Sequence, residues 1–254
     1  RFPLPGTKAR SWYLGDGGAL TDAKPSQAGV DAFRYDPSAL PSTNFTGNTG
    51  AGGLWKATPT YRWLNNPAGT ALSYVSAPLS ADTTVVGAGA VQTWIKADKP
   101  SVDLQVTVSE VRPDGLETFV QGGWMRASGR KLDAAKSTEL APYPSLRKKD
   151  IKPLPKGKYS LVTVPLYYQG HAYRAGSRLR IVISAPGGAQ PIWEFDAQPS
   201  GTANVSLARS PSMPSRVLLP AIAGAKVPTP LPPCPGLRGE PCRPYVALAN
   251  TPGR

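Results

Sequence analysis

Histidine is almost missing from this chain, in which His171 is the single copy among 254 residues. Imidazole is the side chain that most readily transfers a proton near neutral pH, so a hydrolytic triad in this chain would have to use His171. Cysteine is nearly as scarce, with Cys234 and Cys242 as its two copies. Two sulfurs without a nearby histidine do not complete a tetrahedral zinc site, and their spacing is not that of a Cys-x-x-Cys redox motif. We therefore expect no metal and no cofactor.

Several motifs that carry chemistry are missing as well. No serine has glycine two positions before and two positions after it, which the nucleophile elbow of an α/β-hydrolase requires. There is no glycine-rich nucleotide-binding loop between a strand and a helix, and the acidic residues lack the spacing of a calcium loop. No apolar run reaches the roughly 20 residues that span a bilayer. Residues 1–6 lack the layout of a signal peptide, so we expect a signal peptide or a preceding domain to lie outside this sequence.

The charge of the chain is one-sided, with a formal net charge of +13 from 29 basic and 16 acidic residues. Part of the excess gathers at residues 147–158, where Pro153 and Pro155 interrupt the run. A nucleic-acid site would place such a patch among aromatic or groove-reading elements, and no such motif follows. The pattern favours a solvated basic loop and predicts no nucleic-acid partner. Attraction to anionic cell-wall polymers or to a membrane surface is the alternative.

Glycine and proline are abundant, with 26 and 29 copies, which suits many short strands joined by turns. No window of 11 or more residues has a helical period. Apolar and polar residues alternate most clearly at 102–109, so we expect a half-buried strand with one polar face there. A turn at 112–115 predicts a hairpin with a returning strand at 116–124. Further strands are expected at residues 11–14, 91–96, 159–167, 179–184, 203–208 and 216–219.

These regularly spaced strands predict an all-β fold, a jelly-roll β-sandwich with long loops. In the strand at 179–184 the alternation places Leu179 and Ile181 inward and Arg180 outward. From about residue 223 the chain is proline-rich and non-periodic, which predicts an extended tail. A local disulfide between Cys234 and Cys242 would pin this tail and indicate an exported protein, and two unpaired thiols in a cytosolic protein are the alternative.

Two sets of residues are candidates for function. His171 lies just before an inward-facing strand, beside Tyr173, which favours a structural histidine hydrogen-bonded at a strand entrance; a catalytic imidazole is the alternative. Trp55, Tyr61 and Trp63 lie close together in an irregular region. Aromatic faces stack on sugar rings, so these three residues are candidates for contact with carbohydrate or substrate. Packing in the core or at a domain interface is the preferred interpretation.

Five short stretches occur in an order that resembles one known family. They are residues 11–15 (Ser-Trp-Tyr-Leu-Gly), 72–79, 103–115, 171–180 and 214–220. Together they resemble the C-terminal jelly-roll domain, of galactose-binding-like type, in the cocaine esterase and X-Pro dipeptidyl-peptidase family of α/β serine hydrolases. The chain departs from the pattern at Ser177, where the family often has a second histidine that is not part of its triad. His171 and Arg178 match the family motif, and we expect both to have structural roles.

The resemblance implies that the catalytic serine, aspartate and histidine lie in an α/β-hydrolase domain that precedes this chain. Residues 1–10 would then be the linker from that domain, 11–222 the sandwich and 223–254 a proline-rich tail. In such proteins this domain packs on the catalytic domain, shapes the substrate cleft and can support homo-oligomers. We expect a non-catalytic domain of a bacterial serine hydrolase, secreted or at the cell surface, that acts on ester, amide or X-Pro peptide bonds. A free-standing carbohydrate-binding module is the alternative, and a hydrolase that uses His171 is the third hypothesis.

Overall fold

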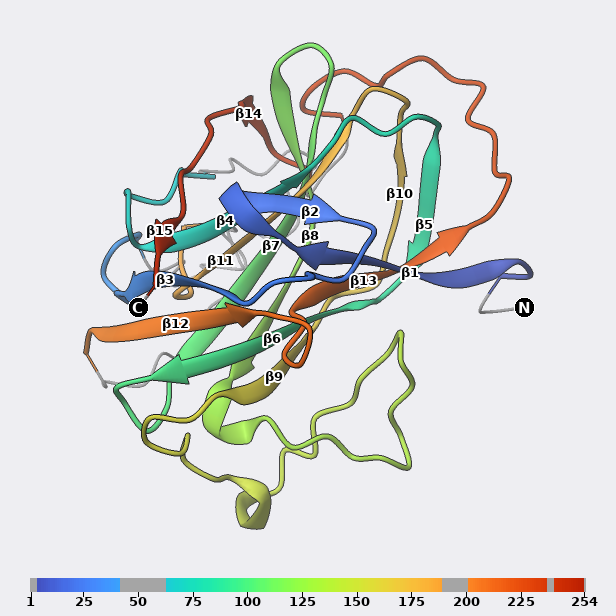
Figure 1. Cartoon of the computed structure of the whole chain (residues 1–254). Helices are drawn as coiled ribbons and strands as arrows, with labels where there is room; N and C mark the ends of the chain where they lie inside the picture. The colour runs from blue at the N-terminus through green and yellow to red at the C-terminus, as the bar shows by residue number, and fades with distance from the viewer. Residues whose placement is uncertain (1–3, 42–62, 189–200, 237–239, 254) are drawn as a thin grey trace, which may run out of the picture.

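The computed structural model describes residues 4–41, 63–188, 201–236 and 240–253. Regular structure in these ranges is almost wholly β (Figure 1). The strands are β1 (Thr7–Leu14), β2 (Ala19–Thr21), β3 (Gly29–Tyr35), β4 (Ala71–Ser76), β5 (Thr83–Gly87), β6 (Ala90–Ala97), β7 (Asp103–Val111), β8 (Leu116–Arg126), β9 (Ser160–Pro165), β10 (Gln169–Tyr173), β11 (Arg178–Ser184), β12 (Ala203–Arg209), β13 (Arg216–Ile222), β14 (Cys242–Pro244) and β15 (Thr251–Pro252). The helical segments are three-residue 3-10 turns, η1 (Asp16–Gly18), η3 (Ala127–Gly129) and η4 (Lys148–Asp150). The predicted all-β class is confirmed.

The strands follow one hydrogen-bonded order, β14-β8-β7-β11-β4-β2-β1-β13-β6-β12-β3-β15, with β9 beside β6 and β5 between β10 and β13. Most neighbours are antiparallel, and the short pair of β2 and β4 is parallel. The order folds back on itself, so that β8, β7, β11 and β4 form one layer and β13, β6, β12 and β3 the other (Figure 1). Neighbours such as β1 and β13 lie far apart in sequence, as the crossing connections of a jelly-roll sandwich require.

The core lies between the two layers and is built from alternate residues of each strand. Leu104, Val106 and Val108 of β7 are each 0% exposed, and Val205 and Leu207 of β12 reach the same core from the opposite layer. Each such side chain contributes roughly 1.5–3 kcal/mol by leaving water. The two-residue alternation that predicts these strands is confirmed on their core side.

The outer face of β7 is also covered, which the alternation does not predict. Asp103, Gln105 and Ser109 are 1%, 4% and 0% exposed, although they belong to the polar face of the strand. Gln105 accepts a hydrogen bond from the Gly187 amide at 3.0 Å, and Ser109 donates to Glu117 at 2.6 Å. The prediction of a half-buried strand was wrong, because every residue of β7 is buried.

The C-terminal tail joins the sheet at two places. β14 pairs with β8 and β15 pairs with β3, so the tail supplies the strands at both ends of the hydrogen-bonded order. The expected disulfide joins Cys234 and Cys242, whose Cα atoms are 5.5 Å apart. The Asn250 side chain accepts a hydrogen bond from the Ser73 amide at 2.7 Å. The tail is therefore an integral part of the sandwich.

The first strand begins earlier than the sequence indicates. β1 pairs with β13 from Thr7 onward, so residues 7–10 of the expected linker belong to the sheet. The basic segment at 147–158 is a loop, as expected, apart from η4. In the described parts of the chain, no helix has the length and apolar character needed to cross a membrane.

Candidate functional site

His171 lies on β10 and is held by a carboxylate from β7. Its Nε2 atom is 2.8 Å from Oε2 of Glu110, and the two side chains are 9% and 4% exposed. The imidazole also packs edge-on against Tyr173, with ring centroids 4.8 Å apart. Burial by itself raises the pKa of Glu110, but the hydrogen bond and the charge of His171 outweigh it, so the pKa of Glu110 lies below its ordinary value. The pair thus joins the middle of β10 to β7. The expected position of His171 just before a strand was wrong, because His171 is the third of the five residues of β10.

A second carboxylate and a serine belong to the same region. Glu240 in the tail accepts a hydrogen bond from Gln169 at 3.4 Å, and burial, with the nearby charge of Glu110, raises the pKa of Glu240. Ser177 is 0% exposed, so its hydroxyl does not reach a substrate. Among the described residues, no hydroxyl or thiol is hydrogen-bonded to the imidazole. A triad needs a nucleophile in contact with its base, and this cluster instead connects β7, β10 and the tail.

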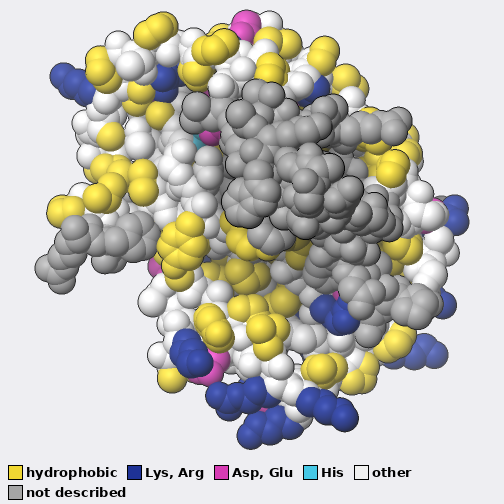
Figure 2. Space-filling view, turned by 180° about the vertical axis from the view of Figure 1, so that it is seen from behind, with side chains coloured by type: hydrophobic (Ala, Val, Ile, Leu, Met, Phe, Trp, Pro, Cys, Tyr) yellow, Lys and Arg dark blue, Asp and Glu magenta, His cyan; other side chains and the backbone are white. Residues whose placement is uncertain are grey.

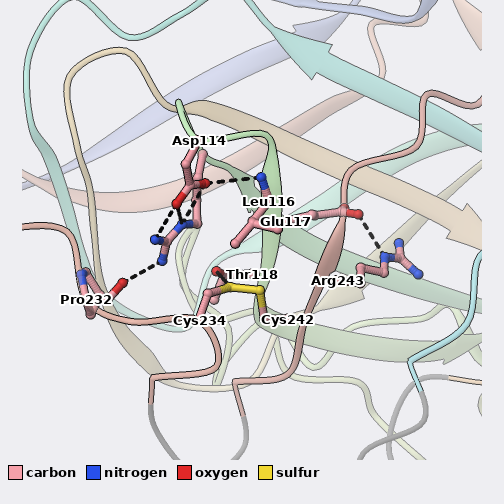
Figure 3. Close-up of a disulfide and its surroundings, with 9 residues drawn as sticks. Asp114, Leu116, Glu117, Thr118, Pro232, Cys234, Cys242 and Arg243 are labelled. Carbon is pink, nitrogen blue, oxygen red and sulfur yellow. Dashed lines mark hydrogen bonds and ion pairs between the residues drawn. A yellow bond between two sulfur atoms is a disulfide. The ribbon is translucent and has the colours of Figure 1, made fainter.

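A larger charge cluster lies under the tail, on the outer face of β8 and β11. Glu117 is 0% exposed, and its carboxylate accepts hydrogen bonds from Arg180 Nη1 and from Arg243 Nε, each at 2.9 Å. Figure 3 shows the contact with Arg243 close to the disulfide. Arg180 points away from the core, as the alternation predicts. The tail nevertheless covers it, with the centre of the Tyr245 ring 5.1 Å from its guanidinium, and leaves it 2% exposed.

The aromatic candidates are only partly within the described residues. Trp55 and Tyr61 lie outside them. Trp63 is half-buried and meets Phe119 edge-on, with ring centroids 5.8 Å apart. The guanidinium of Arg243 lies 3.7 Å from the centre of the Trp63 ring. Arg243 therefore occupies a face of the indole on which a sugar would stack, and Trp63 is packed against the tail and β8.

Arg178, the second residue of the family motif, lies apart from the His171 pair. Its side chain is exposed at the start of β11, and its backbone is paired with Val111 of β7. Neither a hydrogen bond nor an ion pair joins the described side chains of Arg178 and His171. Arg178 and His171, for which we expect structural roles, therefore lie at separate places in the fold.

An open groove of about 600 Å³ lies beside the start of β1. Its lining is formed by residues 8–11, 13, 22, 79–83 and 221–224. The Arg10 guanidinium is 3.4 Å from the Asp22 carboxylate and 4.4 Å from the centre of the Trp12 ring. Asp82 accepts a hydrogen bond from the Ala175 amide at 2.9 Å, which joins the wall of the groove to the turn after β10. Within the described ranges, no group of three or more His, Cys, Asp and Glu side chains is placed to hold a metal.

The fold and the charge clusters around His171 and Glu117 define the class of protein. It is an all-β sandwich domain in which the His171 imidazole is buried against a carboxylate and is hydrogen-bonded to no described hydroxyl or thiol. The chain belongs to the family of X-Pro dipeptidyl-peptidase C-terminal non-catalytic domains, which it matches over residues 1–213. The resemblance predicted from the five sequence stretches is confirmed. The tail lies beyond the matched residues, so Arg243 and the disulfide add to the part that defines the family.

Relatives of this chain are much longer proteins. It is 26% identical over 230 residues to "Putative serine esterase Mb1866c" of Mycobacterium bovis, and the match covers 87% of this chain and 35% of that protein. "Putative serine esterase MT1883" of Mycobacterium tuberculosis matches with the same identity and coverage. The chain therefore spans about a third of the length of the curated relatives it matches.

Solved structures with the same fold are also parts of longer chains. A CocE/NonD family hydrolase from Staphylococcus aureus matches with a TM-score of 0.64 and 20% identity, over 87% of this chain and 38% of that one. An aminopeptidase from a Thaumarchaeota archaeon of marine sediment matches with a TM-score of 0.65 and 15% identity, over 88% of this chain and 38% of that one. At these identities the similarity shows the fold.

Proposed function

We propose that this chain is the C-terminal domain of a longer serine hydrolase, where it packs on an α/β-hydrolase domain and shapes the substrate cleft. The observation that carries the proposal is the unequal coverage: the match takes up 87% of this chain but 35% of a relative named as a serine esterase. The remaining two thirds of such a protein leave room for the catalytic domain. Ester or amide bonds, including X-Pro peptide bonds, are the substrates that the family name and the relatives' names support.

Two features of the surface support this role. The groove beside β1 presents Arg10 from β1, together with Asp22 just after β2 and Asp82 just before β5, so it can contribute polar contacts to a cleft formed with a second domain. The disulfide between Cys234 and Cys242 supports export, and we propose a secreted or cell-surface bacterial protein. The galactose-binding-like class of jelly roll and a homo-oligomeric assembly are further parts of the proposal.

The experiment compares this chain alone, the upstream hydrolase domain alone and the two joined, with a nitrophenyl ester and an X-Pro nitroanilide as substrates. We expect no turnover by this chain, and a lower KM or a higher kcat for the joined protein than for the hydrolase domain alone. His171→Ala in the joined protein lowers stability and leaves kcat of the folded fraction unchanged. Turnover by this chain that His171→Ala abolishes with the fold retained would refute the proposal.

The same material tests the alternative of a carbohydrate-binding module. The carbohydrate-binding alternative would be favoured if this chain binds a glycan and if Trp55→Ala or Trp63→Ala abolishes that binding while the circular dichroism spectrum stays unchanged. We expect no such loss for Trp63→Ala, because Arg243 already covers a face of this indole.

A further inference from the structure

The connection between β8 and β9 carries an unusual set of surface side chains. Residues 130–158 of this connection are called the basic loop below. Leu146, Ile151 and Tyr143 are 81%, 54% and 47% exposed, and they are three of the eight exposed large hydrophobic side chains in the described ranges. Leu146 has a φ of 52°, in the left-handed region that residues other than glycine seldom adopt. Exposed apolar side chains concentrated on one loop indicate a contact surface.

Lysines stand among these apolar side chains along the loop. They are Lys148, Lys149, Lys152, Lys156 and Lys158, and all five are exposed. None of them forms an ion pair with a described carboxylate. Figure 2 shows Lys and Arg side chains gathered at the lower end of the molecule, which is where the basic loop lies in Figure 1, with apolar side chains between them. The surface of the loop is therefore both cationic and apolar.

Acidic residues and arginines of the basic loop are engaged within the protein. Asp150 binds Lys131 at 2.6 Å, and Asp133 binds Arg147 at 3.1 Å. The Arg130 guanidinium donates to backbone carbonyls at 2.7 and 3.1 Å. The positive charge that is left over at the surface is consequently carried by lysines. Protein–protein interfaces are enriched in arginine and depleted in lysine, so this composition is not typical of a protein partner.

A buried leucine and backbone hydrogen bonds fix the basic loop to the sandwich. Leu154 is 6% exposed in the core, and its amide donates to the Pro100 carbonyl at 2.7 Å. The Lys152 amide donates to the Ser128 carbonyl at 2.8 Å. These anchors keep Leu146 on the surface, because the neighbouring part of the loop is already fixed to the sandwich. Its exposure belongs to the folded structure.

We propose that the basic loop binds the surface of an anionic lipid bilayer, with the five lysines at the headgroups and Leu146 and Ile151 inserted between them. Lysine attracts an anionic surface as a point charge and needs no fixed geometry, which suits a fluid layer of headgroups. Apolar side chains flanked by lysines are the usual means by which a protein lies on a membrane interface. The groove beside β1 is lined by residues outside the loop.

The test is sedimentation of the full chain with vesicles of phosphatidylcholine and phosphatidylglycerol, and with vesicles of phosphatidylcholine alone. We expect binding to the anionic vesicles that weakens as salt is added. The triple variant Lys148→Gln, Lys149→Gln, Lys152→Gln is expected to bind on the order of 100-fold more weakly, since each lysine near an anionic surface contributes about fivefold. Leu146→Ser keeps the net charge and is expected to weaken binding severalfold.

The matched control changes three exposed lysines elsewhere on the described surface. It is the variant Lys8→Gln, Lys24→Gln, Lys226→Gln, which has the same net charge as the first triple variant. We expect it to bind almost as tightly as the wild type, and thermal melts check that all variants are folded. The proposal is overturned if the wild type does not sediment with anionic vesicles at low salt, if both triple variants lose binding equally, or if Leu146→Ser binds as the wild type does. Binding to a soluble acidic polymer or to an acidic protein, without binding to vesicles, would overturn it in favour of those partners.

Discussion

Replacing Glu117 by glutamine removes the carboxylate that Arg180 and Arg243 share. In the wild type this carboxylate also accepts a hydrogen bond from Ser109 at 2.6 Å. Glutamine has nearly the same shape and keeps one oxygen as an acceptor, so the substitution leaves no large cavity. It leaves two guanidinium groups close together under the tail without the negative charge that compensates them.

The size of the stability loss depends on how deeply the three charged side chains are buried. The side chains of Glu117, Arg180 and Arg243 are 0%, 3% and 11% exposed, so solvent screens these charges only weakly. Removal of one partner from a buried ion pair typically costs about 3–5 kcal/mol, mostly because the other charge is stranded. For a chain of this size, each kcal/mol corresponds to about 2–4 °C in Tm. We therefore expect Glu117→Gln to lower Tm by on the order of 10 °C.

Urea unfolding followed by tryptophan fluorescence, with a thermal melt beside it, measures the loss. The control is Asp22→Asn, because Asp22 pairs with Arg10 at the surface, where the side chains are 75% and 38% exposed, and such pairs contribute about 0–1 kcal/mol. Adding Arg243→Met to Glu117→Gln removes one stranded cation and retains an apolar side chain against Trp63. If stranded charge is the cause, the double variant is more stable than Glu117→Gln alone.

Two results would refute this reasoning. One is a free energy of unfolding for Glu117→Gln that lies within about 1 kcal/mol of the wild type or matches that of Asp22→Asn. The other is a double variant less stable than Glu117→Gln, since that would show that the hydrogen bonds of Arg243 matter more than its uncompensated charge.

Two further predictions concern the disulfide and the pair at His171. Reduction of the disulfide, or the double change Cys234→Ser and Cys242→Ser, is expected to lower the free energy of unfolding by about 2.5 kcal/mol, because the unfolded chain then regains the entropy of the open loop. Urea unfolding with and without reductant measures this loss. Because the pKa of Glu110 is lowered in the folded state, its pair stabilises the fold above the ordinary carboxyl pKa of about 4.3 and loses this effect as pH falls through the folded value. The difference in unfolding free energy between wild type and Glu110→Gln should therefore be larger at pH 6 than at pH 3; a constant difference would contradict the linkage.

Strand positions were predictable where alternation is strong. β7 and β8 were found by the alternation at 102–109 and the turn at 112–115, because an apolar face repeats every second residue and a Pro-Asp-Gly turn separates the strands. β3 was missed. It carries Asp31 and Arg34 within seven residues, and Asp31 reads as a loop residue until its partners are known. In the structure Asp31 is 4% exposed, accepts hydrogen bonds from the Tyr74 hydroxyl and the Arg209 guanidinium, and belongs to the sheet.

The partners of the candidate site residues could not be predicted from the sequence. His171 is hydrogen-bonded to Glu110, which is 61 positions away, and no local pattern identifies it. The sequence offered no sign that Arg180 would be buried, because an arginine at an outward position of a strand normally meets water. The tail places Arg243 and Tyr245 over that position, and only the folded chain shows this.

The sequence by itself determined the all-β class, most strands of the two layers, the local disulfide and the family, because each depends on residues close together in the chain or on motifs in a fixed order. The tertiary structure alone decided which polar faces are covered, which charges are paired and which apolar side chains remain on the surface. The physical reason is the range of the interactions. Alternation acts over two residues, whereas the ion pair of Asp31 with Arg209 joins positions 178 residues apart and exists only after the sandwich closes.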